Sequence, residues 1–164
     1  MSGWLNINKL FVPLLLIFTL SAQAETLEGK VVKIADGDTL TILTSSSQQI
    51  KVRLAGIDTP ERKQPFGNRA KQALANLAFQ KQAFVEVETK DKYGRTVGVV
   101  FVDGQNVNAE LVRLGIAWVY RKYNKDMALY ELECRAKKER LGLWLEENPI
   151  PPWEWRRGRR YSHR

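Results

Sequence analysis

Residues 49–61 read QIKVRLAGIDTPE, and the fold prediction starts from this stretch. In its first half, Ile50, Val52 and Leu54 alternate with polar residues, which is the pattern of a β-strand with one buried face. Arg53 falls on the other face, where a ligand can reach it. The second half is typical of a strand end followed by a turn, and it carries two carboxylates. The stretch therefore predicts a strand that presents an arginine beside acidic side chains.

The rest of the chain predicts four further strands and three helices. Alternation and β-branched residues place the strands at residues 27–34, 39–44, 83–89 and 95–102. Apolar residues at helical spacing place the helices at residues 70–78 (with Asn68 as the cap), 107–114 and 127–140. Five short, closely connected strands favour a small closed barrel, because closure removes exposed sheet edges. The spacing alone leaves an open α+β sheet as the alternative.

Composition excludes several kinds of chemistry. The chain has one histidine, His163, and one cysteine, Cys134. Histidine-based acid–base catalysis, zinc fingers and Cys-x-x-Cys redox motifs therefore lack their residues. Cys134 falls near the apolar stripe of the third helix and is expected to be buried. The net charge is +8 and the isoelectric point about 9.7, which favours a polyanionic partner, although basic exported proteins are common.

Residues 1–24 are expected to be a secretory signal peptide. Lys9 precedes an apolar run from Leu10 to Leu20, and small residues at 21–24 suit cleavage after Ala24. The run is too short to span a bilayer as a helix, and an uncleaved anchor is the alternative. Cleavage leaves 25 basic and 18 acidic residues, a net charge of +7. The mature protein is then expected in the periplasm or outside the cell, as a monomer without stable membrane association.

The remaining 140 residues divide into one domain, at 25–148, and a tail, at 149–164. In the tail, three prolines discourage regular structure, and tryptophans alternate with arginines. Aromatic and arginine side chains can stack on bases and pair with phosphates. A solvated end, with its tryptophans packed on the domain, is the alternative.

Three short segments carry the chemistry: residues 36–39 (DGDT), 53–61 (RLAGIDTPE) and 91–95 (DKYGR). Each is an ordinary turn when taken alone, with Gly37 supplying a positive φ in the first. Together they offer carboxylates that can hold a hard divalent cation and arginines that can clamp a phosphate. A metal with guanidinium groups is the equipment for attack on a phosphodiester. We therefore predict a metal-dependent nuclease.

These segments closely resemble the thermonuclease family, the staphylococcal-nuclease-like proteins. The resemblance runs from Val31 to Trp144 and includes two helical segments as well, VNAELVR at 107–113 and AKKERLGLW at 136–144. It implies a five-stranded OB-fold barrel with three α-helices, α+β but mainly β. It also implies calcium-dependent hydrolysis of DNA and RNA that leaves 3′-phosphate ends.

The resemblance also implies roles for individual residues. One calcium ion would be held by the carboxylates of Asp38 and Asp58 and the backbone carbonyl of Thr59, with Asp36 in the outer shell. Glu61 would be the general base, and Arg53 and Arg95 would hold the scissile phosphate. The residues beside the rest of the substrate would be Lys92, Tyr93, Trp118 and Tyr120.

Two departures from the family pattern concern access to the substrate. The connection at residues 62–67 is shorter than in the best-known members. Trp118 stands where those members have a tyrosine on the base-stacking wall; it still offers an aromatic face, and packing in the core is the alternative.

The rival interpretation is a non-catalytic OB-fold module that binds single-stranded nucleic acid. Such a module has no use for carboxylates beside a polyanion, because they repel it. The joint presence of Asp38, Asp58 and Glu61 favours the nuclease, with a cation between them and the phosphate.

Overall fold

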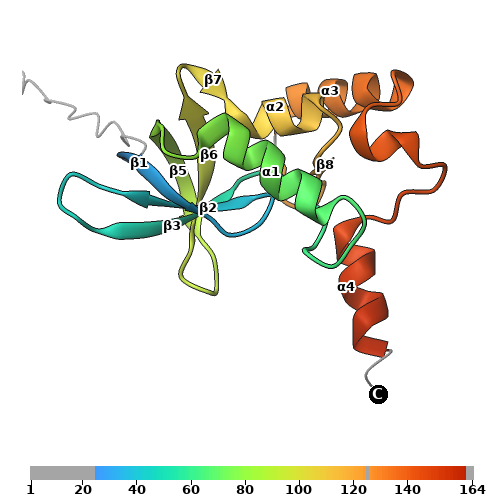
Figure 1. Ribbon diagram of the computed structural model, residues 1–164, viewed down its shortest axis with the longest axis horizontal. Coiled ribbons are helices and arrows are strands. Elements are labelled where there is room, and N and C mark those ends of the chain that lie inside the picture. Colours follow the sequence, from blue (N-terminus) through green and yellow to red (C-terminus); the bar gives the residue numbers. More distant parts are fainter. Residues whose placement is uncertain (1–24, 125, 162–164) are drawn as a thin grey trace, which may run out of the picture.

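The computed structural model describes residues 25–124 and 126–161, so the predicted signal peptide lies outside the described residues. The strands are β1 (Thr26–Ile34), β2 (Thr39–Leu43), β3 (Gln49–Leu54), β4 (Ile57–Asp58), β5 (Gln82–Lys90), β6 (Thr96–Val102), β7 (Gln105–Asn106) and β8 (Trp118–Val119). The helices are α1 (Gly67–Ala78), α2 (Val107–Arg113), α3 (Met127–Lys138), the 3-10 turn η1 (Gly142–Leu145) and α4 (Pro152–Tyr161). Figure 1 shows the strands gathered at one end of the molecule and the helices beside them.

The five long strands close into a barrel. They pair in the order β3-β2-β1-β5-β6, and β7 extends the sheet beyond β6. A parallel pairing of β3 with β6, in which Val52 faces Thr96 and Leu54 faces Gly98, closes the circle. The remaining pairs of long strands are antiparallel. The prediction of a five-stranded α+β barrel of the OB type is confirmed, and the open sheet is excluded.

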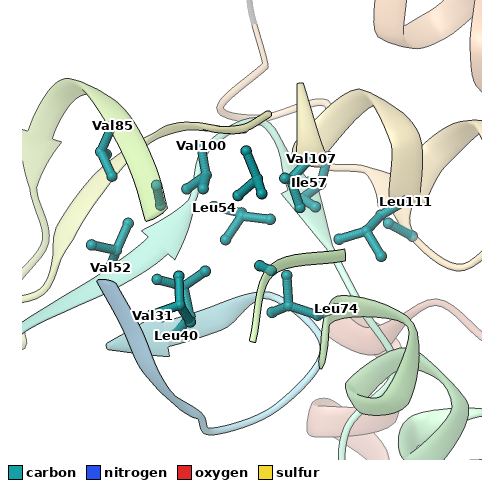
Figure 2. Close-up of a cluster of buried hydrophobic side chains, with 14 of the residues drawn as sticks. Val31, Leu40, Val52, Leu54, Ile57, Leu74, Val85, Val100, Val107 and Leu111 are labelled. Carbon is teal, nitrogen blue, oxygen red and sulfur yellow. The ribbon is translucent and has the colours of Figure 1, made fainter. Parts of the chain in front are cut away.

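The core fills the barrel and continues under the helices. Val31, Val52 and Val100 are fully buried from the strands, as alternation in the sequence requires. Figure 2 shows these side chains meeting Leu74 from α1 and Leu111 from α2. Burial of this apolar surface, at about 25 cal/mol per Å², is the main stabilising contribution in a chain with one cysteine.

The three predicted helices are present, with two corrections of detail. Helix α1 begins at Gly67, and Phe66, in a left-handed conformation, precedes it without a side-chain cap. Asn68 was therefore the wrong cap. Glycine permits this early start because a Cβ at position 67 would clash with the carbonyl oxygen of Glu61. Cys134 is exposed rather than buried, because α3 buries the neighbouring Glu133 instead.

The tail is more regular than its prolines suggested. Residues 152–161 form helix α4, which starts at Pro152. Proline is favoured at a first helical position, because its missing N–H would have no partner there and its φ is already suitable. In Figure 1, α4 lies next to the loop that leads into α1. Within residues 25–124 and 126–161, no helix is both long enough and apolar enough to cross a membrane.

Candidate active site

The register of the barrel brings the three predicted segments together. Thr39, the first residue of β2, pairs with Arg53 of β3, so Asp38 arrives beside that arginine. Arg53 pairs in turn with Val97 of β6, close to Arg95 at the start of that strand. The turn at Ala55 and Gly56 then returns the chain, through β4, to the same edge of the barrel. Strand pairing thus brings the three segments together, and the β3–β6 pairing does so between segments far apart in the sequence.

Arg53 lies between two buried aspartates. Its Nη1 atom is 2.5 Å from Oδ1 of Asp38, and its Nη2 atom is 3.2 Å from Oδ1 of Asp58. Nη2 also donates to the carbonyl oxygen of Ile57. The side chain of Asp58 is 1% exposed and that of Arg53 is 17% exposed. The guanidinium is therefore rigidly held, with one edge toward solvent.

The Asp36–Thr39 turn is packed against the residue after Asp58. The backbone N–H of Thr59 donates to Oδ2 of Asp38 over 3.2 Å. A Cβ at Gly37 would lie 2.6 Å from Oγ1 of Thr59 and from Cβ of Ala70. Gly37 does not adopt a positive φ, so that expectation was wrong. Glycine is required here by the close approach of the two segments.

Arg95 stands at the side of this cluster. Its Nε and Nη2 atoms are each 2.7 Å from the same oxygen, Oδ2 of Asp91, within the turn at residues 91–95. Its Nη1 atom lies 3.5 Å from the hydroxyl of Thr39, next to Asp38 in the chain. Both predicted arginines therefore reach the same edge of the barrel.

A third arginine, Arg156 of α4, enters the site from the tail. Its Nη2 atom is 2.6 Å from Oδ2 of Asp58, and its Nη1 atom is 2.7 Å from Oε1 of Glu61. Nη1 also lies 3.3 Å from Oδ1 of Asp58. The sequence predicted nucleic-acid contacts for the arginine-rich tail, but its pattern did not distinguish Arg156 from the other tail arginines. No local pattern identifies which of several tail arginines reaches a site 98 positions away.

Gln64 ties the tail to the connection that carries Glu61. Its Oε1 atom accepts from the backbone N–H of Glu61 over 3.1 Å, and its Nε2 atom donates to the carbonyl oxygen of Ile150 over 2.6 Å. Gln64 is itself buried. The short connection at residues 62–67 is thus a docking point for the segment that leads into α4.

The predicted stacking residues Trp118 and Tyr120 pack against Trp153 of α4. The β4–β8 pairing places Trp118 opposite Asp58, which brings the aromatic wall next to the carboxylates. Trp118 packs edge-on against Trp144 and Trp153, at 4.4 and 5.8 Å between ring centroids. Tyr120 is stacked on Trp153, with ring centroids 5.5 Å apart and planes 5° apart. These faces are thus occupied by aromatic side chains of the protein.

Lys92 and Tyr93 lie apart from the cluster, at the tip of the turn between β5 and β6. Tyr93 is 73% exposed. The Lys92 ammonium and the Arg95 guanidinium both lie over its ring, at 5.1 and 5.6 Å from the centroid. The pair is placed to contact a ligand that extends past Arg95.

Burial and charge shift the pKa values of the site in different directions. Burial raises the pKa of Asp36 to about 6, and repulsion from Asp38 adds to this effect. Burial also acts to raise the pKa of Asp38, but the Arg53 guanidinium outweighs it and holds that pKa below its ordinary value. The pKa of Asp58 is raised by burial, against the hydrogen bonds from Arg156. Asp38 is therefore the firmly ionised member of the site.

The donor set at this edge suits a hard divalent cation. Asp38 and Asp58 supply carboxylate oxygens, and Thr59, the residue after Asp58, supplies a backbone carbonyl oxygen. Calcium is bound by such oxygens. In the described part of the chain, no three acidic, histidine or cysteine side chains form a cluster ready for a metal. Arginine nitrogens contact these carboxylates instead. Cationic partners there indicate that the carboxylates need positive charge between them.

The fold and the site define an OB-type barrel protein with arginines and carboxylates joined at one edge. Residues 51–146 match the family model described as staphylococcal nuclease homologue. A micrococcal nuclease of Shigella flexneri is 46% identical over 153 residues, covering 87% of each chain. An uncharacterized endonuclease of Haemophilus influenzae is 44% identical over 155 residues, covering 93% of this chain and 87% of the relative. The chain belongs to the staphylococcal nuclease family, as the resemblance in its sequence predicted.

A plant relative matches a shorter part of the chain. The staphylococcal-like nuclease CAN1 of Arabidopsis thaliana is 40% identical over 114 residues, which cover 70% of this chain and 35% of the relative. The chain is thus homologous to nucleases and endonucleases from bacteria and from a plant.

Proposed function

We propose that this protein is an exported, calcium-dependent nuclease that hydrolyses phosphodiester bonds of DNA and RNA and leaves 3′-phosphate ends. One observation carries the proposal: Asp38, Arg53 and Asp58 are buried together at one edge of the barrel, with Glu61 and Arg95 at its margin. Homology to a micrococcal nuclease and to endonucleases supports a nucleic-acid substrate.

The carboxylates are the strongest argument for catalysis rather than binding alone. Acidic side chains repel a polyanion, so a binding module gains nothing from burying them beside its ligand site. A calcium ion held by Asp38, Asp58 and the carbonyl of Thr59 would reverse the local charge and stabilise negative charge on the phosphate. Asp38, with its depressed pKa, is ionised and ready for this role at neutral pH.

The two predicted arginines supply the transition-state stabilisation. Phosphodiester attack accumulates charge on the equatorial oxygens, and Arg53 and Arg95 bind that charge better than the singly charged ground state. In other phosphoryl transfers one such arginine contributes about 10³–10⁵ in rate. That factor corresponds to roughly 4–7 kcal/mol.

In this proposal Glu61 acts as the general base. It accepts a proton from water, the resulting hydroxide attacks phosphorus, and the bond from phosphorus to the 5′ oxygen breaks. The phosphate stays on the 3′ oxygen, and the departing 5′ oxygen takes a proton from solvent. Glu61 can accept this proton only when Arg156 is not paired with it.

The test is a cleavage assay with the mature protein on plasmid DNA, single-stranded DNA and RNA. Cleavage is expected with calcium and not with a chelator, and a panel of other divalent ions establishes the preference. Products should resist extension by a polymerase until a phosphatase removes the 3′-phosphate. Binding without cleavage under every condition would instead support the non-catalytic module.

Export is tested separately. The protein, expressed with residues 1–24 in a bacterial host, is expected in the periplasm or medium with Glu25 as its first residue, as determined by N-terminal sequencing. Retention at the membrane with residues 1–24 intact would support the uncleaved anchor.

A further inference from the structure

We infer that helix α4 is an inhibitory latch, which covers the catalytic cluster until a divalent cation and substrate displace it. The latch consists of α4 with its two inserted side chains, Trp153 and Arg156. The inference rests on the proposed function, because it concerns access to the same site.

The first observation is where Arg156 lies. Its guanidinium pairs with both oxygens of Asp58 and with Glu61, over 2.6 to 3.3 Å. These are a proposed metal ligand and the proposed general base. Arg53 already contacts Oδ1 of Asp58, so with Arg156 in place both carboxylate oxygens are paired with guanidinium groups. A divalent cation added to these oxygens would be repelled strongly by the two arginines, because little water screens charges there. Arg156 therefore occupies the place that a metal-bound site needs.

The second observation is independent of charge. Trp153, three residues earlier in α4, is stacked on Tyr120 and packs against Trp118. These two rings are the surfaces on which bases of the substrate are expected to stack. A parallel ring at 5.5 Å leaves no room for a base on that face of Tyr120. One helix thus covers the phosphate site with an arginine and the base site with a tryptophan.

The third observation concerns how the latch is attached. Gln64 bonds the carbonyl oxygen of Ile150 and the N–H of Glu61, so the tail is fixed next to the base. Pro152 is buried at the start of the helix, whereas Arg157 and Gly158 are exposed. The main core cluster of the barrel includes no residue of α4. The ionic and aromatic contacts of α4 can therefore be replaced by contacts with metal and nucleotide without disturbing that core.

The arithmetic of a latch is simple. If only a fraction of molecules is open, the apparent dissociation constant for the cation increases by the inverse of that fraction. A latch that is closed nine-tenths of the time weakens calcium binding about tenfold. Removing the Arg156 contact should restore most of that factor.

The first experiment measures calcium binding to the full mature chain by calorimetry. Arg156→Ala is compared with wild type and with Arg157→Ala, which removes the same charge from the next, exposed position of the helix. We expect Arg156→Ala to bind calcium at least about fivefold more tightly than wild type, and Arg157→Ala to differ by less than about twofold. Equal affinities in the three proteins would overturn the latch.

The second experiment follows α4 itself by hydrogen exchange, which separates displacement from a local charge effect. In wild type, calcium should increase the exchange of amides at residues 155–158, while those of β1 and β6 stay protected. In Arg156→Ala, the same α4 amides should exchange rapidly already in chelator. Protection that is unchanged by calcium or by the substitution would overturn the inference.

The third experiment asks whether Trp153 covers the substrate site or binds substrate. If it is part of the latch, Trp153→Ala lowers the KM for single-stranded DNA; an increased KM would identify α4 as a substrate-binding arm and refute the latch. Failure of the latch and failure of the proposed function give different results. If cleavage depends on calcium but the variants show the same calcium affinity and hydrogen exchange as wild type, the latch is refuted and the proposed function stands. If no variant binds calcium or cleaves nucleic acid, both the latch and the proposed function are refuted.

Discussion

Asp38 and Arg53 form a buried ion pair, with Oδ1 of the aspartate 2.5 Å from Nη1 of the arginine. The two residues belong to different sequence motifs, and the β2–β3 pairing, in which Thr39 faces Arg53, brings them side by side. The pair fixes the guanidinium plane and keeps Asp38 ionised at the same time. Arg53 is therefore held as a rigid fork, and its replacement by a flexible cation should be costly to the proposed activity.

Lysine in place of Arg53 or Arg95 is therefore expected to abolish most activity in a folded protein. Lysine keeps the charge but loses the planar pair of donors that holds a phosphate. We expect kcat/KM to fall at least about 10²-fold, measured on single-stranded DNA with calcium, with the circular dichroism spectrum unchanged. Arg113→Lys is the matched control, because Arg113 forms a comparable bidentate contact with Glu110 away from the site. Near-normal turnover in either active-site variant would rule out the phosphate clamp.

Glutamine in place of Glu61 tests the general base. It preserves the size and an acceptor oxygen for Arg156 but cannot take a proton at neutral pH. Base catalysis typically contributes about 10²–10⁴, so kcat should fall by at least 10²-fold with a smaller change in KM. Glu88→Gln, at an exposed position of β5, is the control. A loss of less than about tenfold would require another residue or water alone to act as the base.

Asparagine in place of Asp36 should stabilise the metal-free protein in a pH-dependent way. The pKa of Asp36 is raised to about 6 in the fold, above its ordinary value of 3.8, chiefly by burial and then by Asp38. The ionised side chain therefore costs stability above pH 6, and that cost disappears as the pH falls toward 4. In chelator, Asp36→Asn should be more stable than wild type by about 1–3 kcal/mol at pH 8, with a smaller difference at pH 4.

Urea denaturation at several pH values measures this difference. Asp103→Asn serves as the control, because Asp103 is exposed in the turn between β6 and β7. Its effect on stability should not vary between pH 4 and 8. If the two variants show the same pH dependence, Asp36 is not a strained carboxylate in the fold.

Asn108 is expected to be a stability residue rather than a catalytic one. Its Oδ1 atom accepts from the N–H of Val100, and its Nδ2 atom donates to the carbonyl oxygens of Ala55 and Gly98, all out of contact with solvent. Asn108→Ala removes the side-chain partners of the Val100 N–H and the Ala55 carbonyl, whereas the Gly98 carbonyl still accepts from the N–H of Ala55. The substitution should cost about 2–4 kcal/mol in the free energy of unfolding. Asn76→Ala, on the exposed face of α1, should cost less than 0.5 kcal/mol by the same urea measurement. A similar cost for both would show that the buried network contributes nothing.

Most strands and helices of this protein could be predicted from short-range patterns in its sequence. The alternation of Ile50, Val52 and Leu54 predicts a strand, because side chains change face at every residue and only one face of a barrel strand is buried. The five strands and three helices follow from such periods, and strand pairing then carries Asp38, Arg53 and Asp58 to one edge. Family membership rests on the same segments.

The features that could be seen only in the tertiary structure depend on packing between segments that are distant in the sequence. Glycine is required at position 37 because Thr59 and Ala70 approach it closely, and at position 67 because the carbonyl of Glu61 does. Cys134 is exposed because α3 turns the neighbouring Glu133 inward. The position of α4 is the structural feature that the sequence predicted least. Asp58 and Arg156 are 98 residues apart, so neither residue periodicity nor local propensity can predict their contact. The contact depends on the surface against which the tail helix packs.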